Sequence, residues 1–194
     1  MKGLLKFSNV TLKRGGRLLF EGLDLELGPG EALQVAGPNG SGKSSLIRLA
    51  AGLLRAEQGN VERAPLALAD EHLALDRELP LRRALRFWAS LPAGTADRLD
   101  PAMALLGLAA LADVPVRLLS SGQAKRATLA RVAASGAPLW LLDEPLNGLD
   151  SAGAECLAGM IGRHRASGGA VLAASHQPLP GEWGRLELGQ RDAA

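Results

Sequence analysis

Residues 37–44, Gly-Pro-Asn-Gly-Ser-Gly-Lys-Ser, have the composition of a loop that holds a chain of phosphates. They fit the pattern G-x-x-x-x-G-K-[ST] at every fixed position, after an apolar run at 32–36 and before a helix-like run at 45–54. The glycines let backbone N–H groups turn toward phosphate oxygens, and the helix adds its N-terminal partial positive charge. Lys43 would bridge the β- and γ-phosphates, and Ser44 would ligate Mg²⁺. A purely structural turn is the alternative, but the complete pattern favours nucleotide binding.

The acid pair Asp143-Glu144 is the second candidate for chemistry, directly after the apolar run 139–142. A carboxylate at the carboxyl end of a buried parallel strand can hold the Mg²⁺ that bridges the β- and γ-phosphates. The neighbouring Glu144 could then polarise an attacking water. A solvated strand exit is the alternative for two adjacent acids, and the phosphate loop upstream favours the catalytic pair.

Hydrophobic patterning predicts the elements that must position these residues. Alternating apolar residues indicate an antiparallel sheet before the loop, and short apolar runs indicate buried parallel strands around it. From 80 to about 135 the strand signals vanish, which predicts a helical lobe inserted into an α/β nucleotide-binding core. Expected strands are 4–12, 17–20, 23–27, 32–36, 60–62, 66–69, 139–142 and 170–174, and expected helices are 45–54, 81–91, 101–111, 123–134 and 151–167.

Length and composition fit one folded domain over 1–194. The chain has 194 residues, of which 47% are hydrophobic and 22% charged, so it can build a core and is not expected to be disordered. A net charge of +2 gives little support for nucleic-acid binding. The only cysteine, Cys156, excludes an internal disulfide, disfavours a zinc site and is expected in the core. No stretch approaches 18 apolar residues, so we expect neither a membrane span nor secretion.

Further motifs follow in a fixed order. Residues 119–123, Leu-Ser-Ser-Gly-Gln, open a helix and in most proteins would be an N-terminal cap. The acid pair comes next, then 147–150, Asn-Gly-Leu-Asp, and then His176, which alone would be interpreted as a surface histidine. Five motifs in this order, over essentially the whole chain, resemble the nucleotide-binding subunits of ABC transporters.

The resemblance implies a P-loop NTPase of the ABC type, with a mixed parallel core sheet, an N-terminal antiparallel subdomain and the helical lobe. It implies ATP and Mg²⁺ as cofactors, and a head-to-tail homodimer that closes on two ATP molecules. Glu144 matches the general base, His176 the switch histidine and Asp150 the acid of a loop that crosses the dimer interface. Catalytic positions would be Lys43, Glu144 and His176, and metal ligands Ser44 and Asp143. Nucleotide-binding positions would be Arg14, Gly37, Pro38, Asn39, Gly40, Ser41, Gly42, Lys43, Ser44 and Ser45, with Ser120, Gly122 and Gln123 contacting the partner's ATP.

Two positions depart from the family pattern. The family usually stacks an aromatic residue on adenine, but this chain has no tyrosine, and Arg14 stands at the matching place. A guanidinium plane can stack on a base, so selectivity for adenine is expected to be looser. The family's glutamine between the loop and the helical lobe is replaced by 70–73, Asp-Glu-His-Leu, where His72 is the best match. Slow basal turnover follows as a hypothesis, which a high ATPase rate of the isolated chain would contradict.

Three stretches are similar to one branch, the ATPases of the bacterial cytochrome c maturation (haem export) system. They are 17–23 leading to Gly-Glu-Ala-Leu-Gln at 30–34, Ala-Asp-Val-Pro-Val at 112–116 and His-Gln-Pro-Leu at 176–179. This similarity implies a peripheral protein on the cytoplasmic face of the inner membrane, with the integral membrane subunits CcmB and CcmC as partners. The membrane subunits are expected to dock near 70–88, where Arg82, Arg83 and Arg86 lie on or beside one helical face. A docking role for these arginines and a solvated helix face are both open.

Three other functions stay as alternatives. An ABC ATPase for another transported substrate would share every motif. A soluble ABC ATPase acting on nucleic acid or ribosomes is disfavoured because no basic stripe with interleaved aromatics is present, so no nucleic-acid partner is expected. A small-molecule kinase would leave 119–123 unexplained.

Overall fold

An antiparallel sheet forms one end of the molecule in the computed structural model, which describes residues 3–90 and 98–189. Its strands are β1 (Leu5–Arg14), β2 (Arg17–Leu27) and β4 (Gln58–Arg63), in the order β2-β1-β4. Gly15 and Gly16, with φ of 56° and 78°, make the tight turn between β1 and β2. The two strands predicted at 17–20 and 23–27 form the single strand β2. The predicted antiparallel sheet is present.

A parallel sheet forms the centre of the molecule. Its strands are β3 (Ala32–Ala36), β5 (Leu66–Ala69), β6 (Leu139–Asp143), β7 (Ala170–Ala174) and β8 (Gly184–Glu187), in the order β5-β6-β7-β3-β8. Sequence patterning missed β8, because Gly-Arg-Leu-Glu at 184–187 is mostly exposed at the sheet edge and lacks an apolar run. The strands β3, β6 and β7 end at one edge, where the candidate site lies.

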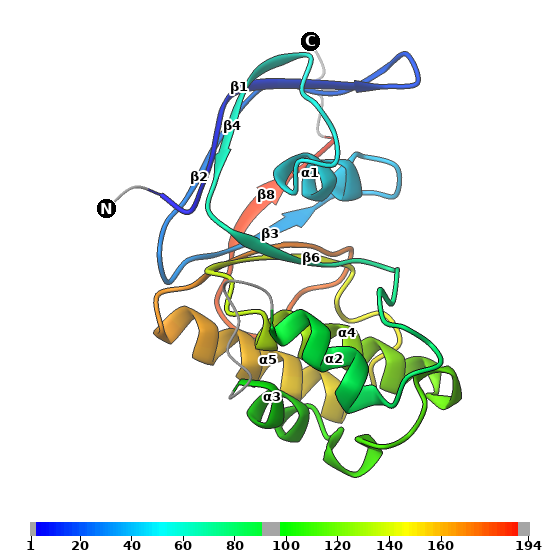
Figure 1. Ribbon diagram of the computed structural model, residues 1–194. Helices are drawn as coiled ribbons and strands as arrows, with labels where there is room; N and C mark the ends of the chain where they lie inside the picture. The colour runs from blue at the N-terminus through cyan, green and yellow to red at the C-terminus, as the bar shows by residue number, and fades with distance from the viewer. Residues whose placement is uncertain (1–2, 91–97, 190–194) are drawn as a thin grey trace.

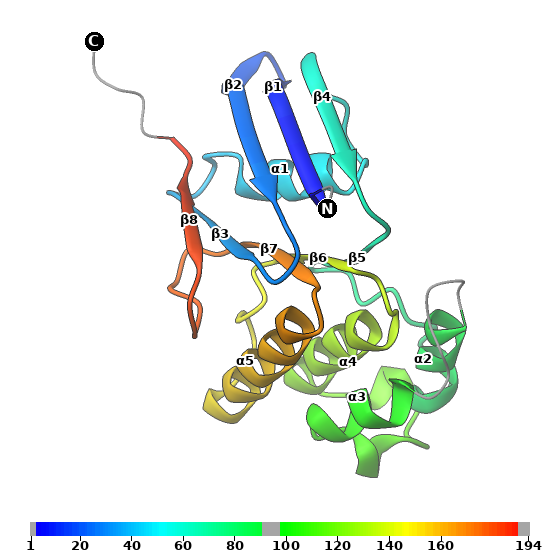
Figure 2. The ribbon, with the colours of Figure 1, turned by 90° about the vertical axis from the view of Figure 1, so that its left-hand side faces the viewer.

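Helices cover both faces of the parallel sheet (Figures 1 and 2). Helix α1 (Lys43–Ala50) lies between the two sheets, and α2 (Leu81–Ala89), α3 (Leu99–Leu105), α4 (Ser121–Ala134) and α5 (Ser151–Ala166) lie on the other side. The helix expected at 101–111 is instead α3 followed by the 3₁₀ turn η2 (Ala109–Leu111), because Gly107 at φ 64° interrupts it. A second 3₁₀ turn, η3 (Val116–Leu118), precedes α4. Helices α2 to α4 fall between β5 and β6 along the chain, where the inserted lobe was predicted.

Strand β6 shows how the two cores are divided. Leu139 and Leu141 pack toward α1 and the antiparallel sheet, whereas Trp140 and Leu142 pack toward the helices of the lobe and α5. All four are at most 4% exposed, which explains why the sequence is apolar throughout instead of alternating. Cys156 packs against the lobe-side core, as expected. In the part of the chain that the structure describes, no helix has both the length and the apolar character needed to cross a bilayer.

Candidate nucleotide-binding site

The loop at 37–42 joins β3 to α1 through backbone conformations that suit glycine. Gly40 and Gly42 have φ of 78° and 105°. A Cβ added to Gly37 would lie 2.3 Å from the carbonyl oxygen of Leu188, so no larger residue fits there. Gly42 begins α1 without a side-chain cap. The first N–H groups of this helix are thus available to an anion such as a phosphate.

Lys43 folds back over this loop. Its ammonium donates hydrogen bonds to the carbonyl oxygens of Gly37 at 2.8 Å and Pro38 at 3.0 Å, and the residue is only 7% exposed. A lysine held by two carbonyls at the loop is well placed to exchange one of them for a phosphate oxygen.

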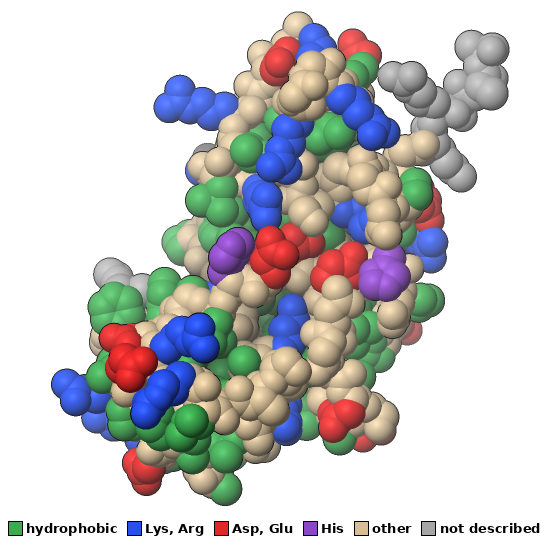
Figure 3. Space-filling model, turned by 90° about the vertical axis from the view of Figure 1, so that its right-hand side faces the viewer, with side chains coloured by type: hydrophobic (Ala, Val, Ile, Leu, Met, Phe, Trp, Pro, Cys, Tyr) green, Lys and Arg blue, Asp and Glu red, His purple; other side chains and the backbone are tan. Residues whose placement is uncertain are grey.

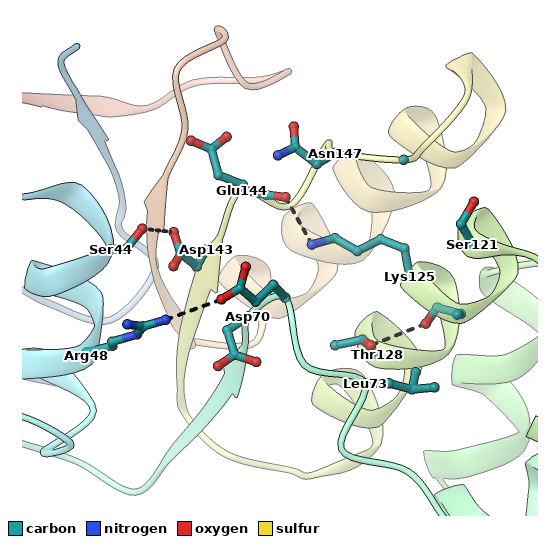
Figure 4. Close-up of a pocket in the computed structure, with 13 residues that line it drawn as sticks. Ser44, Arg48, Asp70, Leu73, Ser121, Lys125, Thr128, Asp143, Glu144 and Asn147 are labelled. Carbon is teal, nitrogen blue, oxygen red and sulfur yellow. Dashed lines mark hydrogen bonds and ion pairs between the residues drawn. The ribbon is translucent and has the colours of Figure 1, made fainter. Parts of the chain in front are cut away.

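Ser44 and Asp143 meet at the end of the parallel sheet (Figure 4). The Ser44 hydroxyl donates to Oδ1 of Asp143 over 3.0 Å. Burial raises the pKa of Asp143, the Ser44 hydrogen bond partly opposes this, and the nearby Glu144 carboxylate adds to the increase. A hydroxyl and a partly desolvated carboxylate form the oxygen donor set that Mg²⁺ prefers.

Glu144 and His176 are brought together by neighbouring strands. Asp143 pairs with Ala174 across β6 and β7, and the Glu144 N–H donates to the Ala174 carbonyl at 2.9 Å. Beyond these strand ends, Nδ1 of His176 lies 2.9 Å from Oε2 of Glu144. Glu144 has φ of 46°, an uncommon conformation for a residue with a side chain. Such strain is concentrated at functional sites.

The segment 119–123 forms the N-terminal cap of helix α4. Ser120 N-caps α4 by accepting the Gln123 N–H at 3.3 Å, while the Gln123 side chain accepts the Ser120 N–H at 2.9 Å. A Cβ added to Gly122 would lie 3.1 Å from the carbonyl oxygen of Gly148. The N-terminal cap that the sequence offered as one interpretation of 119–123 is therefore present. Ser120 and Ser121 are exposed on the surface.

A cleft of about 450 Å³ separates α4 from the end of β6. Ser44, Asp143 and Glu144 line one side of it, and Lys125 crosses from α4 to donate to the Glu144 carbonyl at 3.0 Å (Figure 4). Burial lowers the pKa of Lys125. Sequence reasoning gave Lys125 no role; the available signal was a lysine two residues after Gln123 on a helix that begins at this cleft.

A smaller pocket of about 320 Å³ lies over the phosphate loop. Arg14 and Leu19 line it together with Asn39, Gly40, Gly42, Lys43, Ser44, Ser45 and Glu144. The Arg14 guanidinium is 3.4 Å from the Ser45 hydroxyl, at the long limit of a hydrogen bond. Arg14 thus lies beside the phosphate loop, and its stacking on a base stays a prediction. Leu19 was not expected there.

The segment 70–73 departs from the expectation for His72. Asp70 and Glu71 line the 450 Å³ cleft, and Glu71 pairs with Arg48 at 3.6 Å. His72 does not line this cleft; its ring lies 3.2 Å from the Asp70 carboxylate, and its side chain is 72% exposed. Asp70 and Glu71 therefore line the cleft in the place expected for His72. In the space-filling view, acidic side chains gather at the hollow between the two halves of this face, with a histidine on either side (Figure 3).

A separate apolar groove of about 550 Å³ runs between β5 and the lobe, with His72 at its rim. Trp88 of α2 and Arg131 of α4 line it, and the Arg131 guanidinium carbon lies 4.7 Å from the Trp88 ring centre. The indole N–H donates to the Ala74 carbonyl, and Arg131 donates to the Leu68 carbonyl at 2.6 Å.

Asp150, the last of the sequence motifs before His176, caps α5. Its carboxylate accepts the Gly153 N–H at 2.8 Å.

Known proteins are similar to this chain in sequence. The family model described as ABC transporter matches residues 20–147. The cytochrome c biogenesis ATP-binding export protein CcmA of Sphingopyxis alaskensis is 58% identical over 180 residues, which cover 92% of this chain and 93% of that protein. CcmA of Rhodospirillum rubrum is 46% identical over 87% of this chain and 78% of its own length.

Solved structures agree with the fold. An ATP-binding subunit of an ABC transporter gives a TM-score of 0.81 at 24% identity, over 89% of this chain and 79% of that chain. A putative metal-chelate type ABC transporter in an inward-facing conformation gives 0.74 at 26% identity, over 92% and 75%. The predicted ABC-type fold, with its two sheets and inserted helices, is confirmed. This chain belongs to the ABC transporter family and, within it, to the CcmA group of cytochrome c biogenesis ATP-binding export proteins.

Proposed function

We propose that this chain is the ATP-hydrolysing subunit of an ABC complex that energises haem handling or export in cytochrome c biogenesis. One observation carries the catalytic part: Ser44–Asp143 at 3.0 Å and Glu144–His176 at 2.9 Å converge beside the buried Lys43. The residues proposed to bind the phosphates, the metal and the attacking water thus lie close together at one edge of the sheet. The relatives named CcmA support the biological part.

The phosphates would bind along the loop at 37–42 and the N-terminus of α1. Lys43 would exchange a carbonyl partner for the β- and γ-phosphate oxygens. Ser44 and Asp143 fit Mg²⁺ as hydroxyl and carboxylate ligands, and the ion would neutralise charge on the phosphates when bound. Arg14 would stack on the base from the adjacent pocket.

Glu144 is the proposed general base. Its carboxylate would orient a water for in-line attack on the γ-phosphorus and take up the proton that this water loses. His176 would hold the Glu144 carboxylate through the 2.9 Å contact and reach the γ-phosphate with its other ring nitrogen. The backbone of Glu144 is fixed independently by Ala174 and Lys125.

A head-to-tail pair of chains would complete each site. Ser120, Gly122 and Gln123 of one chain would meet the γ-phosphate bound to the other, and Asp150 would lie near the interface. Loss of the γ-phosphate then removes the bridge between the two chains and reopens the pair. The exposed start of α4 supports this arrangement.

The opening and closing would be passed to integral membrane subunits like CcmB and CcmC, at the cytoplasmic face of the inner membrane. Docking near 70–88 is supported by the groove lined by Trp88 and by Phe87, which is 62% exposed. Arg82 pairs with Asp100, which leaves Arg83 and Arg86 as the arginines on α2 for a docking role.

The test is to purify the tagged chain with Glu144→Gln from gently solubilised membranes in the presence of ATP, and to identify the copurifying proteins by mass spectrometry. Glu144→Gln should retain ATP binding and reduce hydrolysis by about 100-fold or more, so that the closed pair accumulates. The matched control adds Lys43→Ala to the same variant, which removes the ATP that closes the pair.

Four outcomes separate the possibilities. The proposal would be supported if haem-handling membrane proteins copurify with Glu144→Gln but not with the control that also carries Lys43→Ala. An unrelated permease would keep the ATPase and overturn the cytochrome c role. Recovery of ribosomes or nucleic acid in place of membrane proteins would favour a soluble ATPase, and wild-type hydrolysis by Glu144→Gln would overturn the assignment of the base.

A further inference from the structure

Gln34 is a polar side chain in the interior of the parallel sheet. It lies in β3, between the neighbouring strands β7 and β8, and is 6% exposed. On the same strand, Ala32, Val35 and Ala36 are apolar and buried, as a central parallel strand requires. An amide in this place is destabilising unless its N–H and C=O groups find partners, so its contacts need explanation.

All three hydrogen bonds of the Gln34 amide go to one short segment. Its Nε2 donates to the carbonyl oxygens of Gln177 at 2.7 Å and Ser175 at 3.4 Å, and its Oε1 accepts the Leu179 N–H at 3.3 Å. The segment 175–179 contains His176. Gln34 therefore binds the backbone on both sides of this histidine.

The segment has left the sheet when it reaches Gln34. The β6–β7 pairing ends at Asp143 and Ala174, and the last ladder-like bond is from the Ser175 N–H to the Val35 carbonyl at 3.2 Å. Within the segment, the Ser175 hydroxyl donates to the Gln177 carbonyl and accepts the Gln177 N–H. These bonds make a local turn, and the Gln34 amide ties that turn to the sheet.

Two stretches that the sequence analysis singled out are joined by this contact. Gly-Glu-Ala-Leu-Gln at 30–34 ends in Gln34, and His-Gln-Pro-Leu at 176–179 contains two of its partner residues. The second stretch supplies the histidine beside Glu144, whereas the first has no contact with that carboxylate among the hydrogen bonds of the described residues. The hydrogen bonds of Gln34 give the first stretch a place in the site.

We propose that Gln34 is a positioning residue for His176. By fixing the backbone at 175, 177 and 179, it holds Nδ1 of His176 within hydrogen-bond distance of the Glu144 carboxylate. Freed from Gln34, the segment can shift, and an error of about 1 Å in a catalytic group can cost up to about 100-fold in rate. The inference rests on the proposed roles of Glu144 and His176.

The test compares steady-state ATP hydrolysis of the 194-residue chain and its variants. Gln34→Met keeps the size of the side chain and removes the three hydrogen bonds. We expect kcat to fall about tenfold while KM for ATP stays within about twofold, because the phosphate loop is untouched. Gln34→Glu is the conservative variant, since a protonated carboxyl can both donate to Gln177 and accept from Leu179, and we expect it to retain more of kcat than Gln34→Met.

The matched control is Leu33→Ala, on the same strand but packed on the other side of the sheet. It should lower Tm while leaving kcat within about twofold at a temperature where the chain is folded. Equal losses of kcat in Leu33→Ala and Gln34→Met would mean that Gln34 acts through stability alone and would overturn the proposal.

A double-mutant cycle with His176→Ala separates this inference from the proposed function. If Gln34 acts through His176, Gln34→Met should change kcat by less than about twofold in the His176→Ala background. Independent, multiplying losses would overturn the inference. An unchanged kcat in His176→Ala itself would instead overturn the proposed role of His176.

Amide hydrogen exchange of the wild-type chain gives a test that needs no variant. The Leu179 N–H should exchange about 100-fold or more slowly than an exposed loop amide, because Gln34 binds it inside the structure. Exchange at the rate of an exposed loop would contradict the proposal even if Gln34→Met failed to fold.

Discussion

The phosphate loop and the start of α4 are both predicted from the sequence to bind phosphate, but different kinds of contact hold the two segments in place. Around the loop, Ser44 binds Asp143, which lies 99 residues further along the chain, and Gly37 packs against the carbonyl oxygen of Leu188. At the start of α4, Ser120 and Gln123 bind each other's backbone in a capping box within one helical turn. One segment is organised by the whole fold, and the other by itself.

In the proposed head-to-tail pair, this difference would let the two segments share one ATP between two chains. The loop side holds the groups that must be placed accurately for chemistry, and it obtains that accuracy from the ends of β3, β6 and β7. The α4 side needs only to present N–H and hydroxyl groups on an exposed helix start. A self-contained cap can approach from a second copy without losing its geometry.

Lys43→Ala should have the largest effect on the loop side of this comparison. Removing the buried ammonium that is proposed to bind the β- and γ-phosphates should weaken ATP binding by about 100-fold or more. Calorimetric titration of the chain with ATP would measure this. Lys13→Ala, which removes an exposed lysine paired with Glu57 at 3.3 Å, is the control and should bind normally. Normal affinity in Lys43→Ala would remove the loop from the site.

Ser120→Arg should break the α4 side alone. A bulky cation at the helix start would obstruct the second chain, so we expect turnover to fall about 30-fold or more. ATP affinity of the single chain should stay within about twofold, since the loop is unchanged. Intact turnover in Ser120→Arg would favour the kinase alternative over the two-chain ATPase.

Arg14→Ala should have a smaller effect, limited to the base end of the pocket. Loss of a stacking guanidinium should weaken ATP binding by about three- to fivefold and affect GTP similarly. Arg17, which pairs with Arg14 across the hairpin, supplies the matched control Arg17→Ala. A selective loss of ATP over GTP would show that Arg14 reads adenine specifically.

Asp143→Asn should give the smallest change, an increase in Tm of the nucleotide-free chain by about 1–3 °C at pH 7. The folded pKa of Asp143 is raised above its ordinary value of 3.8, so burial costs stability once the carboxyl is ionised. That cost is absent below the unfolded pKa and grows as pH rises through the folded pKa. Thermal melts should therefore show the gain shrinking as pH falls, and a gain independent of pH would contradict this account.

Sequence reasoning predicted the elements whose patterns are local. The phosphate loop follows a regular motif, and β6 and β7 are short, fully apolar runs, so their places are fixed by composition. The strand β8 was missed because it is an edge strand that pairs only with β3, and its residues are mostly exposed. The interpretation of 1–194 as one domain stays a prediction.

Site residues that belong to a sequence motif could be proposed from the sequence. Residues that reach the site only through contacts with distant parts of the chain could not. Glu144 and His176 were expected to be the general base and the switch histidine, and the pairing of β6 with β7 brings their side chains together. Lys125, Leu19 and Gln34 were not assigned to the site, because their importance comes from partners 19 to 145 residues away or from pocket shape. His72 was matched to the cleft by its position in the sequence, and a shift of one or two positions along 70–73 decides which side chain enters the cleft.

The contact between Trp88 and Arg131 gives this protein an internal optical reporter. The indole joins α2 to α4 beside the edge strand β5, and an indole's emission depends on nearby charge and on water. The chain has only three tryptophans, so replacing Trp140 and Trp183 by phenylalanine would leave Trp88 as a single fluorophore. Its emission would then follow, in real time, whether ATP or a membrane partner reshapes the groove.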